Sequence, residues 1–131
     1  MRATMPETMM EDYATELIDK LVKHYHVCLN YRYTFDSDRS RVNRNRKGDI
    51  TLIISVPHLL EHKWSGFLEY HRLRKYVPNR FKGMAGIHQH VLHEFAHVLA
   101  LVHDGQHTHN AYFVKWYLKL MKQFPYKEDS A

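Results

Sequence analysis

The pentapeptide His93-Glu94-Phe95-Ala96-His97 combines residue types that hold a metal ion and use it in hydrolysis. Two histidines four positions apart on a helix project from one face about one turn apart, so both imidazoles can reach one zinc ion at about 2.0–2.1 Å. Glu94 lies beside that pair, where its carboxylate can accept a proton from a water held by the metal. The spacing therefore predicts His93 and His97 as zinc ligands and Glu94 as a general base.

The residues around the pentapeptide favour a metal site over a chance match. The apolar pair 91–92 precedes it and the apolar run 98–102 follows it. Such flanks predict a buried helix, and a buried helix has no solvation reason to carry two histidines and a glutamate. On a solvated helix, by contrast, the same five residues would need no function.

A catalytic zinc usually takes three protein ligands and leaves a fourth position for water. His103 has the six-residue spacing that metzincins use, but they place a glycine midway, where this chain has Ala100. A helix that continues through Ala100 turns His103 away from the metal. His109 instead begins the last predicted helix, and an antiparallel return of that helix would bring it to the site. We favour His109 over His103 as the third ligand, with Asp104 and His107 as further candidates.

The elements that must position these residues follow from the hydrophobic periodicity. Apolar residues at three- and four-residue spacing predict helices over residues 6–25, 87–103 and about 110–123. Alternation predicts a strand over 29–35, and a β-branched run predicts another over 50–56. A basic stretch, 40–46, predicts an edge strand between two turns, the second at residues 47–49. We expect an α+β fold with a three-stranded antiparallel meander whose last strand is the most buried.

Length and composition limit the organisation of the chain. At 131 residues it has room for one domain, which we place at residues 1–131. Its single cysteine excludes an intramolecular disulfide framework and a cysteine-based zinc ribbon. No apolar run approaches the ~20 residues needed to cross a bilayer, and the N-terminus lacks the apolar core of a secretory signal. We therefore expect a cytoplasmic protein with no membrane partner.

The positive charge is concentrated in the middle of the chain. Residues 1–19 carry five acidic residues and one basic residue, whereas residues 32–82 carry twelve basic residues and five acidic ones. The basic segments 39–47 and 63–82 could contact the phosphates of DNA, with nearby aromatic residues stacking on unpaired bases. A basic hairpin edge is equally well explained as a solvated surface that keeps the protein soluble. Both interpretations stay open from the sequence.

Two segments, VLHEFAHVLA at 91–100 and HNAYFVKWYLKL at 109–120, resemble the core of the SprT-like (Spartan-type) zinc metallopeptidases, which include small phage and bacterial metallohydrolases. In that family a third histidine follows in an H-x-x-x-F context, which matches His109 and Phe113. An N-terminal helix and a basic hairpin ending in a small residue, here Ser55, are also similar. The resemblance implies an α+β zinc peptidase that cleaves DNA-bound proteins. The chain departs from the pattern at Asn110, where family members often have glycine.

The sequence thus predicts a zinc-dependent metallopeptidase that hydrolyses peptide bonds of a protein or peptide substrate. Two alternatives remain. The same residues would serve a zinc hydrolase of a non-peptide amide or ester, because any carbonyl can be polarised in the same way. The second alternative is a non-catalytic nucleic-acid-binding module with a structural zinc. A zinc ion bound by four protein ligands would favour this alternative.

Overall fold

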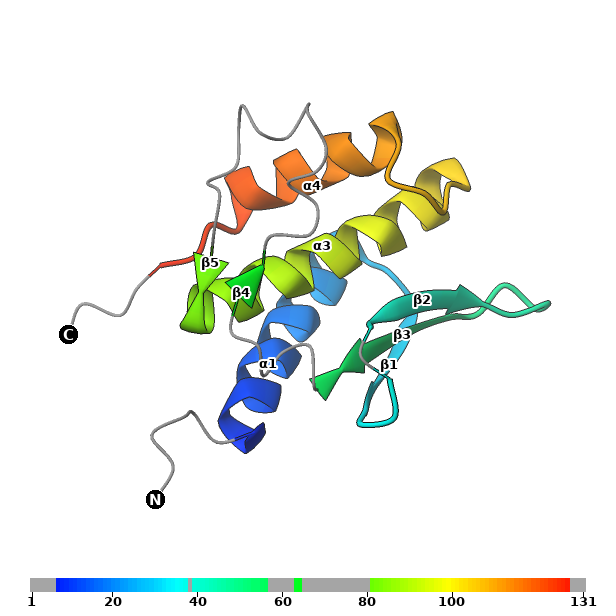
Figure 1. Cartoon of the computed structure of the whole chain (residues 1–131). Helices are drawn as coiled ribbons and strands as arrows, with labels where there is room; N and C mark the ends of the chain where they lie inside the picture. The colour runs from blue at the N-terminus through cyan, green and yellow to red at the C-terminus, as the bar shows by residue number, and fades with distance from the viewer. Residues whose placement is uncertain (1–6, 38, 57–62, 65–80, 128–131) are drawn as a thin grey trace, which may run out of the picture. The chain divides into compact units, whose positions relative to one another are not determined.

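The computed structural model describes residues 7–37, 39–56, 63–64 and 81–127. They belong to two compact units, residues 1–61 and residues 62–131, whose elements are drawn in Figure 1. Helices and a three-stranded sheet give the α+β class that the sequence predicts. The assignment of residues 1–131 to a single domain stays a prediction.

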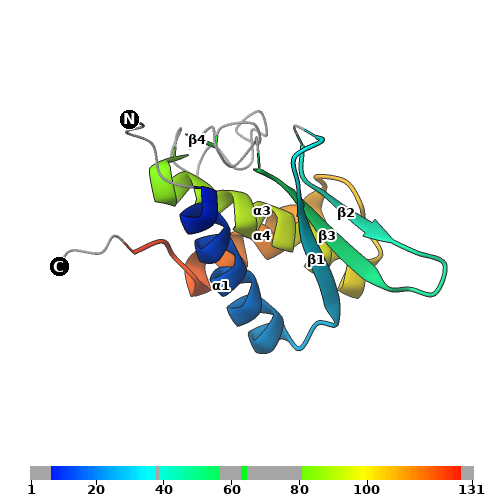
Figure 2. The same cartoon turned by 90° about the horizontal axis from the view of Figure 1, so that it is seen from below.

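In the first unit, helix α1 (Glu7–Tyr25) lies along strand β1 (Leu29–Thr34), as Figure 2 shows. Tyr33 of β1 joins the two elements, because its hydroxyl lies 2.6 Å from Thr15 Oγ1 and donates to the carbonyl oxygen of Glu11 at 3.0 Å. The Tyr31 hydroxyl donates to Asp19 at 3.0 Å. The predicted apolar stripe of α1 is buried at Met10, Ala14, Leu17, Ile18 and Leu21.

The sheet also contains β2 (Arg41–Arg44) and β3 (Ile50–Ser55), in the order β1–β3–β2. Strand β3 is antiparallel to β2 but parallel to β1, with Leu29 opposite Ile50. The predicted three-stranded antiparallel meander is therefore wrong. The physical reason for the different order is burial, because the apolar strand β3 takes the centre of the sheet, where both its edges are paired. Strand β3 is buried at every position except Thr51, as predicted for the last strand.

The turn predicted at residues 47–49 is present between β2 and β3. Asn45 Oδ1 accepts the backbone N–H groups of Lys47 and Asp49, each at 2.9 Å. Gly48 has a φ of 90°, a conformation in which a side chain is strained. This local chemistry fixes the register in which β2 meets β3.

In the second unit, β4 (Lys63–Trp64) pairs antiparallel with β5 (Phe81–Lys82), and helix α3 (Gly83–Asp104) follows directly. Helix α3 begins at Gly83, four residues before the predicted start. Helix α4 (Ala111–Gln123) returns antiparallel beside α3 (Figure 1), as predicted. Among the described residues, none of the helices has the length and apolar character that crossing a membrane requires.

Two polar contacts, one of them buried, fix how α4 lies on α3. The hydroxyl of Tyr117, in the middle of α4, donates to Gln89 Oε1 at 2.6 Å. Beyond the end of α4, the carbonyl oxygen of Phe124 accepts from His88 Nε2, also at 2.6 Å. Both bonds tie α4 and the residue after it to the first half of α3. The connector that joins the two helices lies at the other end of α3, after Asp104.

Candidate metal centre

Helix α3 presents His93, Glu94 and His97 on an unbroken and largely buried stretch. His93 is 4% exposed, Glu94 is 5% exposed, and His97 is half-buried. Their apolar neighbours are fully buried, namely Val91, Leu92, Phe95, Ala96, Val98, Leu99, Ala100 and Leu101. Burying imidazoles and a carboxylate costs free energy that only partners recover, so these positions are a candidate functional site.

The connector after α3 brings the third histidine back. Gly105 adopts a φ of 66°, and its N–H and that of Gln106 donate to the carbonyls of Leu101 and Ala100. The left-handed glycine ends the helix, as such residues commonly do. Asn110 then starts α4 as its N-cap, accepting the backbone N–H groups of Tyr112 and Phe113.

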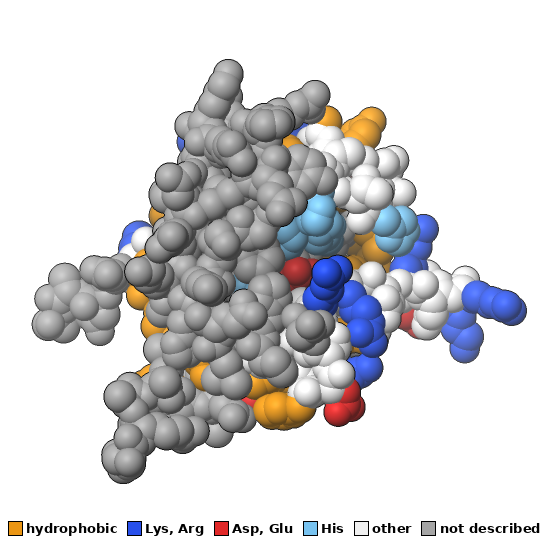
Figure 3. Space-filling view, viewed as in Figure 1, with side chains coloured by type: hydrophobic (Ala, Val, Ile, Leu, Met, Phe, Trp, Pro, Cys, Tyr) orange, Lys and Arg blue, Asp and Glu red, His pale blue; other side chains and the backbone are white. Residues whose placement is uncertain are grey.

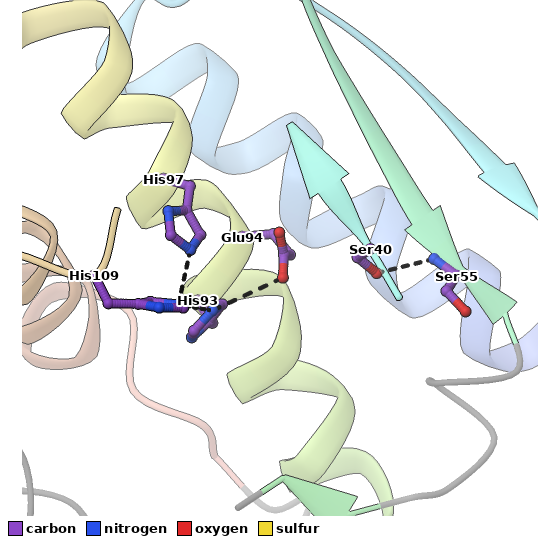
Figure 4. Close-up of polar contacts among 6 residues, drawn as sticks. All are labelled: Ser40, Ser55, His93, Glu94, His97 and His109. Carbon is purple, nitrogen blue, oxygen red and sulfur yellow. Dashed lines mark hydrogen bonds and ion pairs between the residues drawn. The ribbon is translucent and has the colours of Figure 1, made fainter. Parts of the chain in front are cut away.

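The three predicted histidines meet between the helix and this connector. His109 Nε2 lies 3.0 Å from His97 Nε2 and 3.1 Å from His93 Nε2, as drawn in Figure 4. The ligand atoms of all three lie within 4.8 Å of one another, close enough to bind a metal ion. Histidine side chains also reach the molecular surface in Figure 3, and His97 and His109 are both partly exposed.

The spacing of these nitrogens suits a small cation. Three nitrogens bound tetrahedrally to zinc at 2.0–2.1 Å lie roughly 3.3 Å apart, a few tenths of an ångström more than the two distances from His109 Nε2. A neutral imidazole carries one N–H and one lone pair, so a bound cation would accept all three facing lone pairs together. The donor set of three imidazoles is one that zinc commonly takes in proteins.

Glu94 lies beside this group and not within it. Its Oε2 is 3.9 Å from His93 Nε2, and Figure 4 shows it on the side of His93 away from His109. Burial raises the pKa of the Glu94 carboxyl from 4.5 to about 8 in the metal-free chain. A dication nearby would favour the ionised carboxylate and lower that pKa. The carboxylate is thus placed to handle a proton next to the histidines.

His97 and His109 are held in the neutral form that binds metals. Burial, with smaller contributions from the nearby His109 and His107, lowers the pKa of His97 to about 3. Burial also lowers the pKa of His109. A neutral imidazole keeps the lone pair that a metal needs, so at pH 7 neither ring must lose a proton before binding.

Phe113 packs against all three rings. Its ring centroid lies 4.8 Å from that of His93, 4.5 Å from His97 and 4.8 Å from His109. The ring is fully buried and stacks on Tyr117. Because aromatic packing restricts ring rotation, Phe113 holds the imidazoles in a fixed orientation.

The other candidates for the third ligand are not part of this group of facing ligand atoms. His103 is exposed and stacks on Trp116, with ring centroids 5.0 Å apart. Asp104 Oδ2 accepts the indole N–H of Trp116 at 2.8 Å. His107 is exposed, and within the described part of the chain the group of facing ligand atoms contains His93, His97 and His109 alone.

The sequence reasoning missed one polar pair near the site. Asn110 Nδ2 donates to Gln106 Oε1 at 2.8 Å, across the residues that include His109. An asparagine directly before an amphipathic helix is a recognisable N-cap signal and could have been used. Nothing in the sequence marks Gln106, because its partner is set by the path of the connector.

The first basic segment, 39–47, belongs to the other unit. Its five basic side chains, Arg39, Arg41, Arg44, Arg46 and Lys47, are all exposed. They lie on β2 and the turns at its two ends. Of the second segment, 63–82, residues 65–80 lie outside the described residues.

Comparisons with protein-family models, with curated proteins and with solved structures find no match for this chain.

Proposed function

We propose that this protein is a zinc-dependent hydrolase, with His93, His97 and His109 as the metal ligands and Glu94 as the general base. The observation that carries the proposal is the meeting of three imidazole nitrogens, with His109 Nε2 at 3.0 and 3.1 Å from the other two, beside a buried carboxylate. Zinc held by these three imidazoles would lower the pKa of a bound water toward ~7 and would polarise a carbonyl.

The residues divide the work by position. The neutral rings of His97 and His109 supply lone pairs without first releasing protons. Glu94 accepts the proton of the attacking water and delivers it to the leaving group, a role that suits a carboxylate adjacent to the ligands. Phe113 keeps the three rings aligned through its contacts with each of them.

The number of ligands supports a catalytic role over a structural one. Among the described residues the group offers three protein ligands, whereas structural zinc sites are usually closed by four. Asp104, one candidate for a fourth ligand, is engaged by the indole of Trp116. A non-catalytic zinc module is therefore the less favoured alternative.

For the substrate we propose peptide bonds, on the strength of the resemblance to SprT-like metallopeptidases. His109 and Phe113, the two positions that carry the resemblance after α3, are both at the histidine group. A non-peptide amide or ester remains the alternative substrate. Zinc-loaded protein should cleave an unstructured protein such as casein faster than it cleaves small aryl esters; cleavage of esters alone would favour the alternative.

The decisive variant is Glu94→Gln, which removes the proton acceptor with almost no change in shape. It should retain one zinc per chain and lose hydrolysis by about 10²–10⁴-fold, the usual contribution of a general base. Glu16→Gln on α1, an exposed glutamate, is the matched control and should keep full activity. If Glu94→Gln loses zinc as readily as His93→Ala does, the assignment of general base is wrong.

We also propose DNA as a partner, through the exposed basic residues of the 39–47 segment. This rests on charge and exposure, because arginine and lysine side chains neutralise phosphates without reading sequence. A partner bound there would make nucleic-acid-associated proteins available as substrates.

A further inference from the structure

Of the three histidines, His109 is the one that no helix holds. His93 and His97 are fixed by the backbone of α3, whereas His109 lies in the connector between Gly105 and the N-cap Asn110. A flexible connector would have to be ordered each time a metal binds, and that ordering costs affinity. Some feature of the connector must therefore reduce this cost if His109 is a strong ligand.

A chain of side-chain hydrogen bonds runs through this connector. The indole N–H of Trp116 on α4 donates to Asp104 Oδ2 at the end of α3, at 2.8 Å. Gln106 Nε2 donates to the carbonyl oxygen of Asp104 at 3.2 Å. Asn110 Nδ2 then donates to Gln106 Oε1 at 2.8 Å, while its Oδ1 caps α4. The chain thus connects the end of one helix to the start of the next.

The bond between Gln106 and Asn110 closes a small loop around residues 107–109. Its two side chains form one edge of the loop, and the backbone carrying His109 forms the other. Closing a short loop in the folded state restricts the conformations of the residues inside it. Because Asn110 is also the N-cap, the loop is attached to α4 at a fixed point.

We propose that the Gln106–Asn110 side-chain bond positions His109 for metal binding, so that both residues are positioning residues of the site. This inference rests on the proposed function. Neither side chain is a ligand in the group of facing nitrogens, and both act through the backbone that carries His109. The side-chain amide of Asn110 supplies both the cap acceptor of α4 and the donor to Gln106.

Zinc affinity, measured by competition with a chromophoric chelator, tests the inference. Gln106→Ala should weaken zinc binding about tenfold, the lower end of the range for groups that orient ligands. Gln123→Ala, at the far end of α4, is the matched control and should leave the affinity unchanged. Circular dichroism melting of each variant reports whether the fold is retained.

Substitutions at Asn110 separate its two roles. Asn110→Ser keeps a cap for α4 but cannot reach Gln106, so it should lose about as much zinc affinity as Gln106→Ala. Asn110→Asp keeps the cap, but it can accept from Gln106 Nε2 only if that amide turns over and gives up its bond to the Asp104 carbonyl oxygen, so it should recover only part of the affinity that Asn110→Ser loses. This pair decides the question even if Gln106→Ala does not fold.

A double-variant cycle identifies the route of the effect. In a His109→Ala background, Gln106→Ala should cause no further loss of zinc affinity, because the residue that it positions is gone. An equal loss in that background would mean a general effect on the fold and would overturn the inference. Unchanged affinity in Gln106→Ala would overturn it while the proposed function stands. A wild-type chain that binds no zinc would overturn both.

Discussion

At the scale of single residues, His103 and His109 show how chain path decides which histidine meets the others. His103 leaves α3 on another side and stacks on Trp116, whereas His109 faces His93 and His97. We therefore predict that His109→Ala weakens zinc affinity by more than about 100-fold, beyond the effect of an orienting group. His103→Ala should leave the affinity unchanged in the same chelator competition.

The opposite result would place the third ligand on α3. A large loss in His103→Ala with none in His109→Ala would require α3 to break near Ala100, as in metzincins. The uninterrupted helix from Gly83 to Asp104 argues against such a break.

The buried ionisable groups predict how the metal-free protein responds to pH. Folding lowers the pKa of His97 from 6.5 to about 3, so between these two pH values the unfolded state binds more protons. That difference makes the folded state lose stability as pH falls from 6.5. Glu94 has the opposite sign, because its pKa is about 8 when folded and 4.5 when unfolded, and its contribution is lost as pH rises from 4.5 to 8.

Between pH 4.5 and 6.5 these two contributions offset each other. Glu94→Gln removes one of them, so in chelator-treated protein its stability should rise with pH relative to wild type. The relative slope should reach about 1.4 kcal/mol per pH unit, the value for one proton. Urea unfolding at a series of pH values measures it. Parallel stability profiles for the two proteins would contradict the prediction.

At the scale of elements, the continuity of α3 turns His103 away from the other histidines. Ala100 lies midway between His97 and His103 on this helix. Ala100→Gly should cost about 1 kcal/mol of stability, because glycine is a poorer helix former and loses more conformational entropy on folding. It should nevertheless retain zinc through His109, since the metal site does not depend on a break there. Thermal melting and zinc titration of the same variant measure both effects. Zinc affinity that then depends on His103 would contradict this account.

Local patterns predicted the helices and the turn at Gly48, because helix periodicity and turn chemistry depend on residues close in sequence. They did not predict that β3 inserts between β1 and β2. Alternation assigns the faces of a strand but not its neighbours, which are set by long-range pairing. The three histidines were predictable because helix periodicity is local: two of them share a helix face, and the third stands at the start of the returning helix.

The connector was harder to predict than either helix. The proposed positioning of His109 depends on a bond between Gln106 and Asn110. That bond is set by the path of the backbone after Gly105. The sequence carries the N-cap signal of Asn110 but no signal for its partner. Side-chain bonds between loop residues follow from the loop conformation, so the sequence alone does not indicate them.

At the scale of the whole molecule, the charge distribution predicts salt-dependent binding of single-stranded DNA. Arg41, Arg44 and Arg46 are exposed on β2 and its following turn, and a triple change to glutamine should weaken binding. If all three contact phosphates, the slope of log affinity against log salt should become shallower by about 2, at about 0.7 per lost contact. Fluorescence anisotropy of a labelled oligonucleotide across a salt series measures both quantities.

The matched control for this prediction carries the same loss of charge elsewhere. Lys115, Lys119 and Lys122 are exposed on α4, and changing all three to glutamine lowers the net charge by the same amount. If binding follows net charge alone, both triple variants should weaken it equally. If the basic hairpin is the contact, the arginine variant should lose both affinity and salt dependence while the lysine variant keeps the wild-type slope. Binding that is undetectable at low salt, or that does not change with salt, would identify the arginines as a solvated surface, because phosphate contacts always release counterions.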